Sequence, residues 1–373
     1  MEEILKQFQT VVADPADIIR RWKIETGGQA IGWSPIYGPQ EMIAAAGMLP
    51  VGVWGGQVEI SEANSYMANF ACSITRAIME FKLKGTYKVL AGIIFSSTCD
   101  HIQCLSDTMK SIFPGQWQWD LVYPKNRQTI GARPYLMKKL EELKAGLEDL
   151  SGKKITNEAF QKSFAVYNES RSLMQQLYTV RRKRPGLLGP REMAAVVKAS
   201  LFLPREEHNR LVAKLLTALE SRRDVLDRGY RLVLTGIMSE PETLLDYITE
   251  FNGIVVDDDL ALGSRLFKNE ISLAGDPLAA LTEYFFSLGP CATLYSPNQN
   301  RGQYLMELVR VSQAHGLIII MMKFCEPEEF DYALINKQLD QAGIPHLYLE
   351  VEQQMQFPEQ LRTPIQAFFE RLG

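Results

Sequence analysis

Short apolar runs alternate with amphipathic stretches in the N-terminal third of the chain. The apolar runs predict buried strands at residues 29–32, 50–54, 91–96 and 120–123. The amphipathic stretches between them predict helices at residues 39–47, 72–84 and 100–112. Pro39 begins the first of these helices and Gly47 ends it, which is the usual asymmetry of helix ends. A strand–helix–strand order of this kind indicates a parallel sheet with right-handed crossovers.

Helical periodicity dominates residues 126–228. Leu136, Leu140, Leu143 and Leu147 recur at three- and four-residue steps, as on the buried face of a helix. A basic run at residues 181–185 lies in the same block. It could meet the phosphates of a CoA-type substrate, but we favour a solvated helix end. This block is therefore predicted to be a helical insertion.

The strand–helix rhythm resumes near Tyr230. Strands are predicted at residues 231–236, 254–256, 316–322 and 346–351, and helices at 242–251, 303–314 and 327–342. We therefore expect an α/β fold of two Rossmann-like lobes with parallel sheets and a helical middle segment. The expected boundaries are 1–125 for the N-terminal lobe, 126–228 for the helical segment and 229–373 for the C-terminal lobe. No residue-level repeat relates the lobes, so their likeness is one of pattern.

Composition narrows the class of protein. The 373 residues are 46% hydrophobic, and 40 Lys and Arg against 44 Asp and Glu give a formal charge of -4. This balance lacks the basic excess that holds a phosphate backbone, so nucleic acid is not an expected partner. The acidic N-terminus and the short longest apolar stretch, residues 317–322, predict a soluble cytoplasmic protein without a membrane span. The sequence also lacks a glycine-rich phosphate loop, so it should not hydrolyse ATP by that means.

Three of the five cysteines stand where ligands bind in open parallel sheets. An odd, sparse set in a large cytosolic chain argues against a disulfide framework and leaves buried thiols, a nucleophile or metal ligands. Cys99 and Cys325 each follow a predicted strand and precede a predicted helix, while Cys72 opens a helix. We expect a helix N-terminus to lower the pKa of such thiols and favour the thiolate that binds iron or zinc. The three could converge in the cleft between the lobes.

Other interpretations of these positions stay open. Free cysteine is among the most buried residue types, and the spacing of the three matches no compact zinc or cluster signature. Cys104, later in the predicted helix 100–112, and Cys291, before a predicted strand at 292–295, are interpreted as core residues. The acidic run 257–259 follows a predicted strand and could hold magnesium, but a loop or helix-capping role is favoured.

Several short motifs together resemble one enzyme family. They are Pro39-x-Glu41, Ala46-Gly47-x-x-Pro50, Phe70-Ala71-Cys72-Ser73, Cys99-Asp100, Val256-Asp257-Asp258-Asp259 and Met322-Lys323-Phe324-Cys325-Glu326-Pro327-Glu328-Glu329. In this order and spacing they resemble the 2-hydroxyacyl-CoA dehydratase and benzoyl-CoA reductase family over essentially the whole chain. The likeness is strongest for the smaller, cluster-bearing catalytic subunit. Two positions depart from the family pattern: Glu326 replaces the common Asp, and Ala333 stands where Pro is usual.

The resemblance implies a cofactor, a chemistry and partners. The cofactor is a 4Fe-4S cluster in the cleft between the lobes, held by three cysteines that correspond position by position to Cys72, Cys99 and Cys325. The implied chemistry, typical of anaerobic metabolism, injects one low-potential electron into an acyl-CoA thioester to give a radical. The implied partners are a larger homologous cluster-bearing subunit and an ATP-hydrolysing iron–sulfur activator or electron donor, with ferredoxin upstream.

The two branches of the family are harder to separate. Residues 151–156, 201–209 and 270–277 look more like the benzoyl-CoA reductase side, and residues 321–325 look more like the dehydratase side. We therefore favour the iron–sulfur subunit of an ATP-dependent, dearomatising benzoyl-CoA-type reductase. The alternative is the beta subunit of an (R)-2-hydroxyacyl-CoA dehydratase, and a third hypothesis is an electron-relay or structural subunit without its own substrate site. The catalytic proton donor stays unassigned, since nothing ranks His208, Glu41 or the tyrosines.

Overall fold

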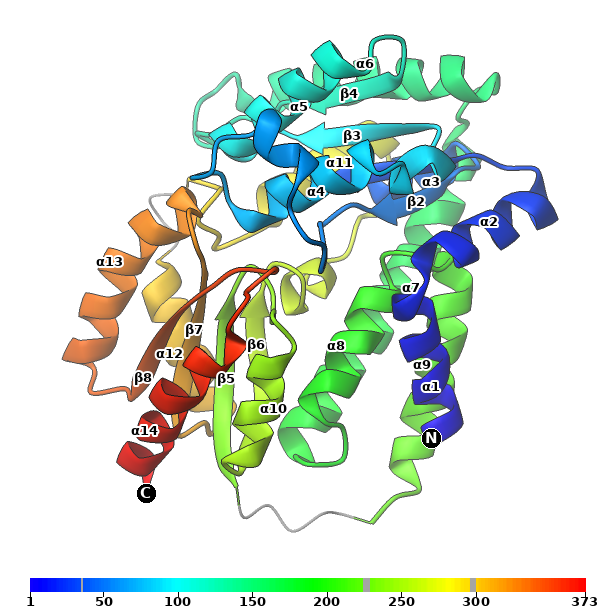
Figure 1. Cartoon of the computed structure of the whole chain (residues 1–373). Coiled ribbons are helices and arrows are strands. Elements are labelled where there is room, and N and C mark those ends of the chain that lie inside the picture. Colours follow the sequence, from blue (N-terminus) through cyan, green and yellow to red (C-terminus); the bar gives the residue numbers. More distant parts are fainter. Residues whose placement is uncertain (35, 224–228, 296–299) are drawn as a thin grey trace.

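The structure is a computed structural model that describes residues 1–34, 36–223, 229–295 and 300–373 (Figure 1). The strands are β1 (Ala30–Ser34), β2 (Leu49–Gly52), β3 (Gly92–Ser96), β4 (Trp117–Leu121), β5 (Tyr230–Gly236), β6 (Gly253–Leu260), β7 (Gly316–Met322) and β8 (His346–Val351). The helices are α1 (Glu2–Ala13), α2 (Pro15–Thr26), α3 (Gln40–Ala45), α4 (Ser73–Leu83), α5 (Asp100–Ile112), α6 (Ala132–Ser151), α7 (Asn157–Lys183), α8 (Pro190–Ala199), α9 (Arg205–Glu220), α10 (Thr243–Glu250), α11 (Pro277–Ser287), α12 (Arg301–Val311), α13 (Glu326–Gln341) and α14 (Arg362–Leu372).

Two four-stranded parallel sheets organise the described residues. Their strand orders are β2-β1-β3-β4 and β6-β5-β7-β8, so the first strand of each sheet lies between the second and the third. Each sheet therefore has a topological switch point, at β1/β3 in one and at β5/β7 in the other. In open α/β sheets the crevice outside the carboxyl ends of strands at such a point is the usual ligand site. This confirms the predicted α/β class with two parallel sheets.

Helices pack the two sheets into one body. Figure 1 shows the first sheet at the top, the second below it, and α7–α9 along one side. The long helix α7 contacts α3 beside the first sheet and β6 of the second, while α1 packs on α8 and α9. A single cluster of buried side chains runs through both sheets and the helices, and it includes Phe8, Trp33, Leu177 and Ile318. The sheets are therefore held in a fixed relation by a shared core.

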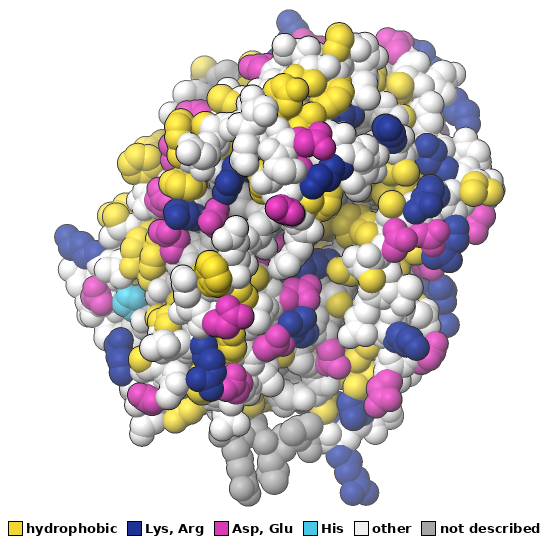
Figure 2. Space-filling view, viewed as in Figure 1, with side chains coloured by type: hydrophobic (Ala, Val, Ile, Leu, Met, Phe, Trp, Pro, Cys, Tyr) yellow, Lys and Arg dark blue, Asp and Glu magenta, His cyan; other side chains and the backbone are white. Residues whose placement is uncertain are grey.

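Charged side chains of both signs are mixed over the face of the molecule that Figure 2 shows. Among the described residues of that face, Lys and Arg lie beside Asp and Glu rather than gathering by sign. Exposed ion pairs of the chain include Arg191 with Asp246 and Arg362 with Glu250. This distribution accords with the near balance of 40 basic and 44 acidic residues in the sequence.

The structure corrects three predicted strands. β4 spans Trp117–Leu121 rather than residues 120–123, and β6 continues through the three aspartates to Leu260 rather than ending at residue 256. The strand predicted at 292–295 is a turn, closed by an isolated bridge between Cys291 and Leu294. The predicted end of the helical segment, residue 228, lies outside the described residues, and the division into three segments stays a prediction. No helix in the described ranges is both long and apolar enough to cross a membrane.

Candidate functional site

The three cysteines occupy equivalent places, each directly before the first residue of a helix. Cys72 is the N-cap residue of α4, Cys99 that of α5 and Cys325 that of α13. Cys99 lies three residues after the end of β3, and Cys325 lies three residues after the end of β7. β3 and β7 are the strands that bound the switch points of the two sheets. The structure therefore confirms the predicted placement: all three cysteines stand at helix starts, and Cys99 and Cys325 also follow strands.

Contacts between the two lobes bring the N-terminus of α4 against the end of β7. The Ser73 hydroxyl donates to Met322 Sδ at 2.9 Å, and the backbone N–H of Gln353 donates to Ser73 Oγ at 3.1 Å. Ser73 follows Cys72, and Met322 precedes Cys325 by three residues. The backbone between Met322 and Cys325 is strained. Phe324 has a φ of 63°, a left-handed conformation that costs a non-glycine residue about 1–2 kcal/mol. Such strain is often found at functional sites.

The three thiols lie close enough to act on one another, but their pKa values are raised, not lowered. Burial raises the pKa of Cys99 to about 11, and repulsion from Cys72 adds to this. Burial also raises the pKa of Cys72, and it raises that of Cys325 further, with contributions from Glu328, Cys72 and Cys99. The first-turn amides of each helix act in the opposite direction but are outweighed. The predicted lowering of the pKa is therefore wrong for the metal-free chain, and a metal that these thiols held would have to displace their protons.

The donor set of this group is three cysteine sulfurs, which are soft ligands of the kind that bind iron–sulfur clusters. Among the described residues, no group of three or more His, Cys, Asp or Glu side chains is arranged to hold one metal ion. A single tetrahedral ion needs sulfur ligands roughly 4 Å apart, because each metal–sulfur bond is about 2.3 Å long. In a 4Fe-4S cluster each thiolate binds a different iron, so the thiols stand further apart. Three thiols on three separate helix starts would each bind a different iron of such a cluster.

The other two cysteines lie outside this group. Cys104 is exposed, which corrects its interpretation as a core residue. Helix α5 buries Ile102, Leu105 and Met109, and the side chain of Cys104 lies on the face away from them. Cys291 is buried as predicted, with its sulfur 3.6 Å from Arg265 Nη1.

The acidic run in β6 is a buried ionic network rather than a capped loop. Arg181 Nη1 lies 3.2 Å from Asp258 Oδ2, and Arg182 Nη1 lies 3.0 Å from Asp257 Oδ2. Both arginines belong to the basic run for which we expect a solvated helix end. This expectation is wrong for Arg181, which is buried, while Arg182 is half-buried. A buried carboxylate is stable only when a cation is paired with it. The last turn of α7 supplies Arg181 and Arg182 as the cations for Asp258 and Asp257. Neither a magnesium site nor a phosphate contact is needed to explain either run.

The third aspartate of the run lies at the centre of the network. Burial alone would raise the pKa of Asp259, but Arg265, Lys268 and Arg301 together hold it well below its usual range. Arg265 Nη2 and Arg301 Nε lie 2.8 Å and 3.2 Å from Asp259 Oδ2. The aspartate thus joins the end of β6 to two guanidinium groups.

One of these guanidinium groups reaches the helix that begins after Cys325. Arg301 Nη1 donates to Glu328 Oε2 at 2.7 Å and to Asp331 Oδ2 at 3.0 Å. Both carboxylates lie in the first two turns of α13, so Arg301 fixes the helix whose N-cap is Cys325. This link was not predicted from the sequence. The sequence signal for it is the run of three aspartates directly after the apolar residues 254–256. Aspartates that continue a buried strand need buried cations as partners.

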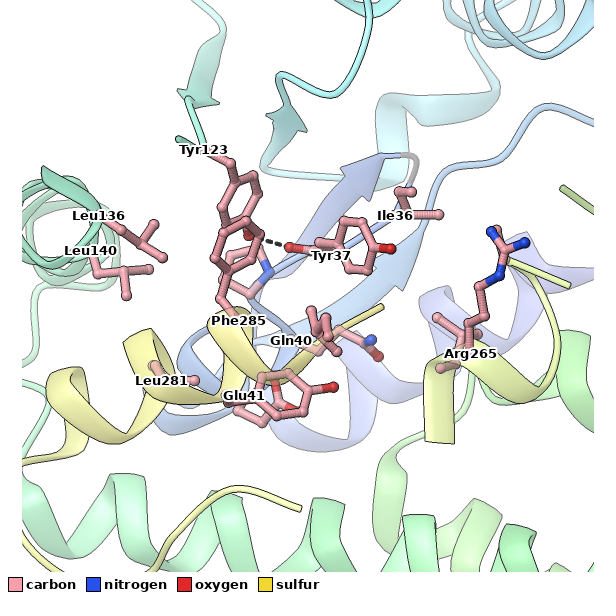
Figure 3. Close-up of a pocket in the computed structure, with 16 residues that line it drawn as sticks. Ile36, Tyr37, Gln40, Glu41, Tyr123, Leu136, Leu140, Arg265, Leu281 and Phe285 are labelled. Atoms are coloured by element: carbon pink, nitrogen blue, oxygen red, sulfur yellow. Dashed lines mark hydrogen bonds between the residues drawn. The ribbon is translucent and has the colours of Figure 1, made fainter. Parts of the chain in front are cut away.

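A small pocket lies between the first lobe and helices α6 and α11 (Figure 3). Leu136 and Leu140 line one side, Arg265 the other, and Tyr123 stacks on Phe285 with ring centroids 4.3 Å apart. Its cavity volume is about 50 Å³, room for a few water molecules and too little for the acyl part of a thioester. In this conformation the pocket is not a substrate site.

The two named candidates for proton transfer have structural roles. His208 is buried between α8 and α9, where its Nε2 lies 3.0 Å from the carbonyl oxygen of Val196. Burial lowers the pKa of His208 to about 3, so it is neutral near pH 7. Glu41 is buried and accepts a hydrogen bond from Arg171. Neither side chain lies free at the three cysteines.

A wider groove opens on the surface beside α4 and the end of β7. Its cavity volume is about 840 Å³, and Arg76, Lys323 and Glu350 are among its lining residues. Arg76 already forms an ion pair with Glu352 at 2.5 Å, and Lys323 lies 3.9 Å from Glu350. The cations of the groove are therefore largely neutralised, which does not favour the binding of phosphate groups.

A buried glutamate on α4 holds the chain that leads to Cys72, and it gives a testable prediction. Glu80 accepts hydrogen bonds from the backbone N–H groups of Ser61 and Ala63 at 3.1 Å and 2.8 Å, and it pairs with Lys84 at 2.9 Å. Although burial acts to raise its pKa, these donors lower it to about 2. We expect Glu80→Gln to destabilise the fold by roughly 2–3 kcal/mol in urea unfolding at pH 7.

The pH dependence of this effect follows from the sign of the shift. The stabilisation is fully present above the unfolded-state pKa of 4.5 and is lost as the pH falls toward about 2. The difference between wild type and Glu80→Gln should therefore shrink over that range. Glu142→Gln, which removes an exposed glutamate paired with Lys139, is the matched control and should change stability little. Equal effects of the two variants would contradict the assignment.

The chain is similar to several enzyme subunits. The family model described as 2-hydroxyglutaryl-CoA dehydratase, D-component, matches residues 35–372. The chain is 35% identical to the (R)-phenyllactyl-CoA dehydratase beta subunit of Clostridium sporogenes, over 100% of this chain and 99% of that protein. It is 36% identical to the beta subunit of the lactoyl-CoA dehydratase of Anaerotignum propionicum, with the same coverage. It is also 33% identical to a benzoyl-CoA reductase subunit of Thauera aromatica, over 90% of each chain.

These matches cover both branches that the sequence motifs suggested. They show an enzyme subunit of dehydratase or reductase type. The chain belongs to the 2-hydroxyglutaryl-CoA dehydratase D-component family.

Proposed function

We propose that this chain is the beta-type subunit of a 2-hydroxyacyl-CoA dehydratase and that Cys72, Cys99 and Cys325 hold a 4Fe-4S cluster. The observation that carries the proposal is that each of the three thiols stands at a helix start, and that the hydrogen bond from Ser73 to Met322 joins the segments of Cys72 and Cys325 across the two lobes. The sequence motifs favoured the reductase branch. The dehydratase is preferred here because two dehydratase beta subunits align over the whole chain at 35% and 36% identity, whereas the benzoyl-CoA reductase relative aligns over 90% at 33%.

The residues of this chain would provide a suitable site for such a group. The cluster supplies single electrons of low potential and, at an iron without a thiolate, a Lewis-acid position. Cys72 is buried and Cys99 and Cys325 are half-buried, which limits access of water to the site. The N-termini of α4, α5 and α13 carry partial positive charge, which offsets the negative charge of three thiolates.

A relay role for this subunit is the second candidate function. The cavity beside Arg265, about 50 Å³, has no space for an acyl group, and in the wider groove beside α4 the cations Arg76 and Lys323 already lie beside carboxylates. In a relay, this chain would pass electrons to a larger homologous subunit that binds the acyl-CoA. The electrons would come from an ATP-hydrolysing iron–sulfur partner supplied by ferredoxin. The reductase branch is the remaining alternative.

The branch is tested with the anaerobically purified complex of this chain with its larger subunit. With activator, ATP and reductant, we expect loss of water from a 2-hydroxyacyl-CoA without net reduction. Formation of a dienoyl-CoA from benzoyl-CoA would overturn the dehydratase assignment in favour of the reductase. A change in the EPR signal of the cluster in this subunit on adding acyl-CoA would contradict the relay role.

A further inference from the structure

We propose that Lys125 is a positioning residue that raises the reduction potential of the centre at Cys72, Cys99 and Cys325. The inference rests on the proposed function. Lys125 follows β4, and its ammonium group donates to the carbonyl oxygens of Ser97 and Thr98 at 2.8 Å and 2.6 Å. These two residues connect β3 to Cys99. Lys125 therefore holds the turn that places this thiol, from a neighbouring strand of the same sheet.

The position of Lys125 also puts a positive charge beside the thiols. Burial lowers the pKa of Lys125, while Cys99, Asp100 and Cys291 act in the opposite direction, and Lys125 in turn acts to lower the pKa of Cys99. The two carbonyl groups use two of its three N–H donors, which leaves one for a sulfur acceptor. Lysine is a compact charge on a flexible stem, so a tie to two carbonyls fixes where that charge lies.

Other cations near the three cysteines are already balanced by carboxylates. Arg76, close to Cys72, pairs with Glu352 at 2.5 Å. Arg301, which reaches the helix of Cys325, pairs with Asp259, Glu328 and Asp331.

Lys125 differs from these arginines in its surroundings. Asp100, the first residue of α5, also acts electrostatically on Lys125, but it forms no ion pair with it. Within the described parts of the chain, no carboxylate lies at ion-pair distance from its ammonium group. Its charge therefore has no carboxylate partner in direct contact among the described residues and lies beside the turn that leads to Cys99.

The sign of the effect follows from Coulomb's law. A cluster gains negative charge when it accepts an electron, and a fixed cation nearby stabilises the reduced form more than the oxidised form. Cys72 is buried and Cys99 and Cys325 are half-buried, but Lys125 is exposed, so water screens the interaction in part and the effect is moderate. Loss of the charge should therefore make the centre harder to reduce.

The test compares Lys125→Met with wild type in the full chain, reconstituted anaerobically with iron and sulfide. Iron content is measured first, and the midpoint potential is then measured by EPR-monitored titration. We expect the reduction equilibrium constant to fall about tenfold, equal to about 59 mV for one electron. Lys125→Arg should keep a potential near that of wild type. Lys110→Met is the matched control, because it removes the same charge from the far end of α5, and it should not shift the potential.

The outcomes separate this inference from the proposed function. If wild type takes up no iron, the proposed function fails. If wild type takes up iron and Lys125→Met has an unchanged potential, only the inference on Lys125 is overturned, and a merely structural role is indicated. Should Lys125→Met fail to fold, Lys125→Gln keeps a hydrogen-bond donor without the charge and decides the question by the same potential.

Discussion

Replacing Cys325 by serine is expected to reduce the iron that the reconstituted chain holds by roughly an order of magnitude, since a thiolate ligand is lost. The same result is expected for Cys72→Ser and Cys99→Ser. Serine is a better helix N-cap than most residues, so α4, α5 and α13 should still begin at the same residues. The substitution therefore removes a soft sulfur donor while keeping the local fold. Iron and acid-labile sulfide per chain are the measured quantities.

The chain supplies its own controls for this experiment. Cys104→Ser changes an exposed thiol on α5, the helix that Cys99 caps, and Cys291→Ser changes a buried thiol outside the group. Both variants should hold as much iron as wild type. Far-UV circular dichroism checks that each variant is folded. An equal loss of iron in Cys104→Ser, or no loss in any of the three ligand variants, would rule out this ligand set.

The strand ends and helix starts that frame the site were predictable from sequence because they depend on local patterns. The predicted strand 346–351 coincides with β8, and the predicted helix 327–342 differs from α13 by one residue at each end. Apolar runs followed by amphipathic stretches define such elements without knowledge of the tertiary structure. The placement of Cys99 and Cys325 beyond β3 and β7 followed directly from these patterns.

What the sequence could not predict depends on partners far along the chain. Three consecutive aspartates are atypical of a strand, yet β6 contains them because Arg181, Arg182 and Arg265 neutralise them from other elements. The same applies to the thiols. A helix N-terminus lowers a thiol pKa in water, but burial in the folded chain raises it more. Tertiary burial therefore decided the protonation of the site, and local sequence decided only its position.

The largest effect on stability is expected for Asp259→Asn. Asp259 is fully buried and lies within 3.2 Å of Arg265, Lys268 and Arg301. Asparagine has nearly the same volume, so the change removes the charge without making a cavity. It leaves two buried guanidinium groups with too few carboxylates, and removing one partner of a buried ion pair costs about 3–5 kcal/mol. Urea unfolding of the metal-free chain at pH 7 measures this difference.

The effect should depend on pH with a definite sign. The pKa of Asp259 in the folded chain lies below its unfolded value of 3.8. Its stabilisation is therefore complete above that value and is lost as the pH falls through the folded-state pKa. Wild type and Asp259→Asn should become more alike as the solution is acidified below about pH 4. An unchanged difference down to pH 3 would contradict an ionised Asp259.

The same substitution should also weaken iron binding at the proposed centre, because Arg301 links Asp259 to Glu328 in the first turn of α13. With Asp259 neutral, Arg301 loses one of its anchors, and the N-cap position of Cys325 is held less firmly. Asp340→Asn, at the exposed far end of α13, is the control and should change neither stability nor iron uptake. Loss of stability in Asp259→Asn with full iron uptake would mean that the network supports the fold without positioning Cys325.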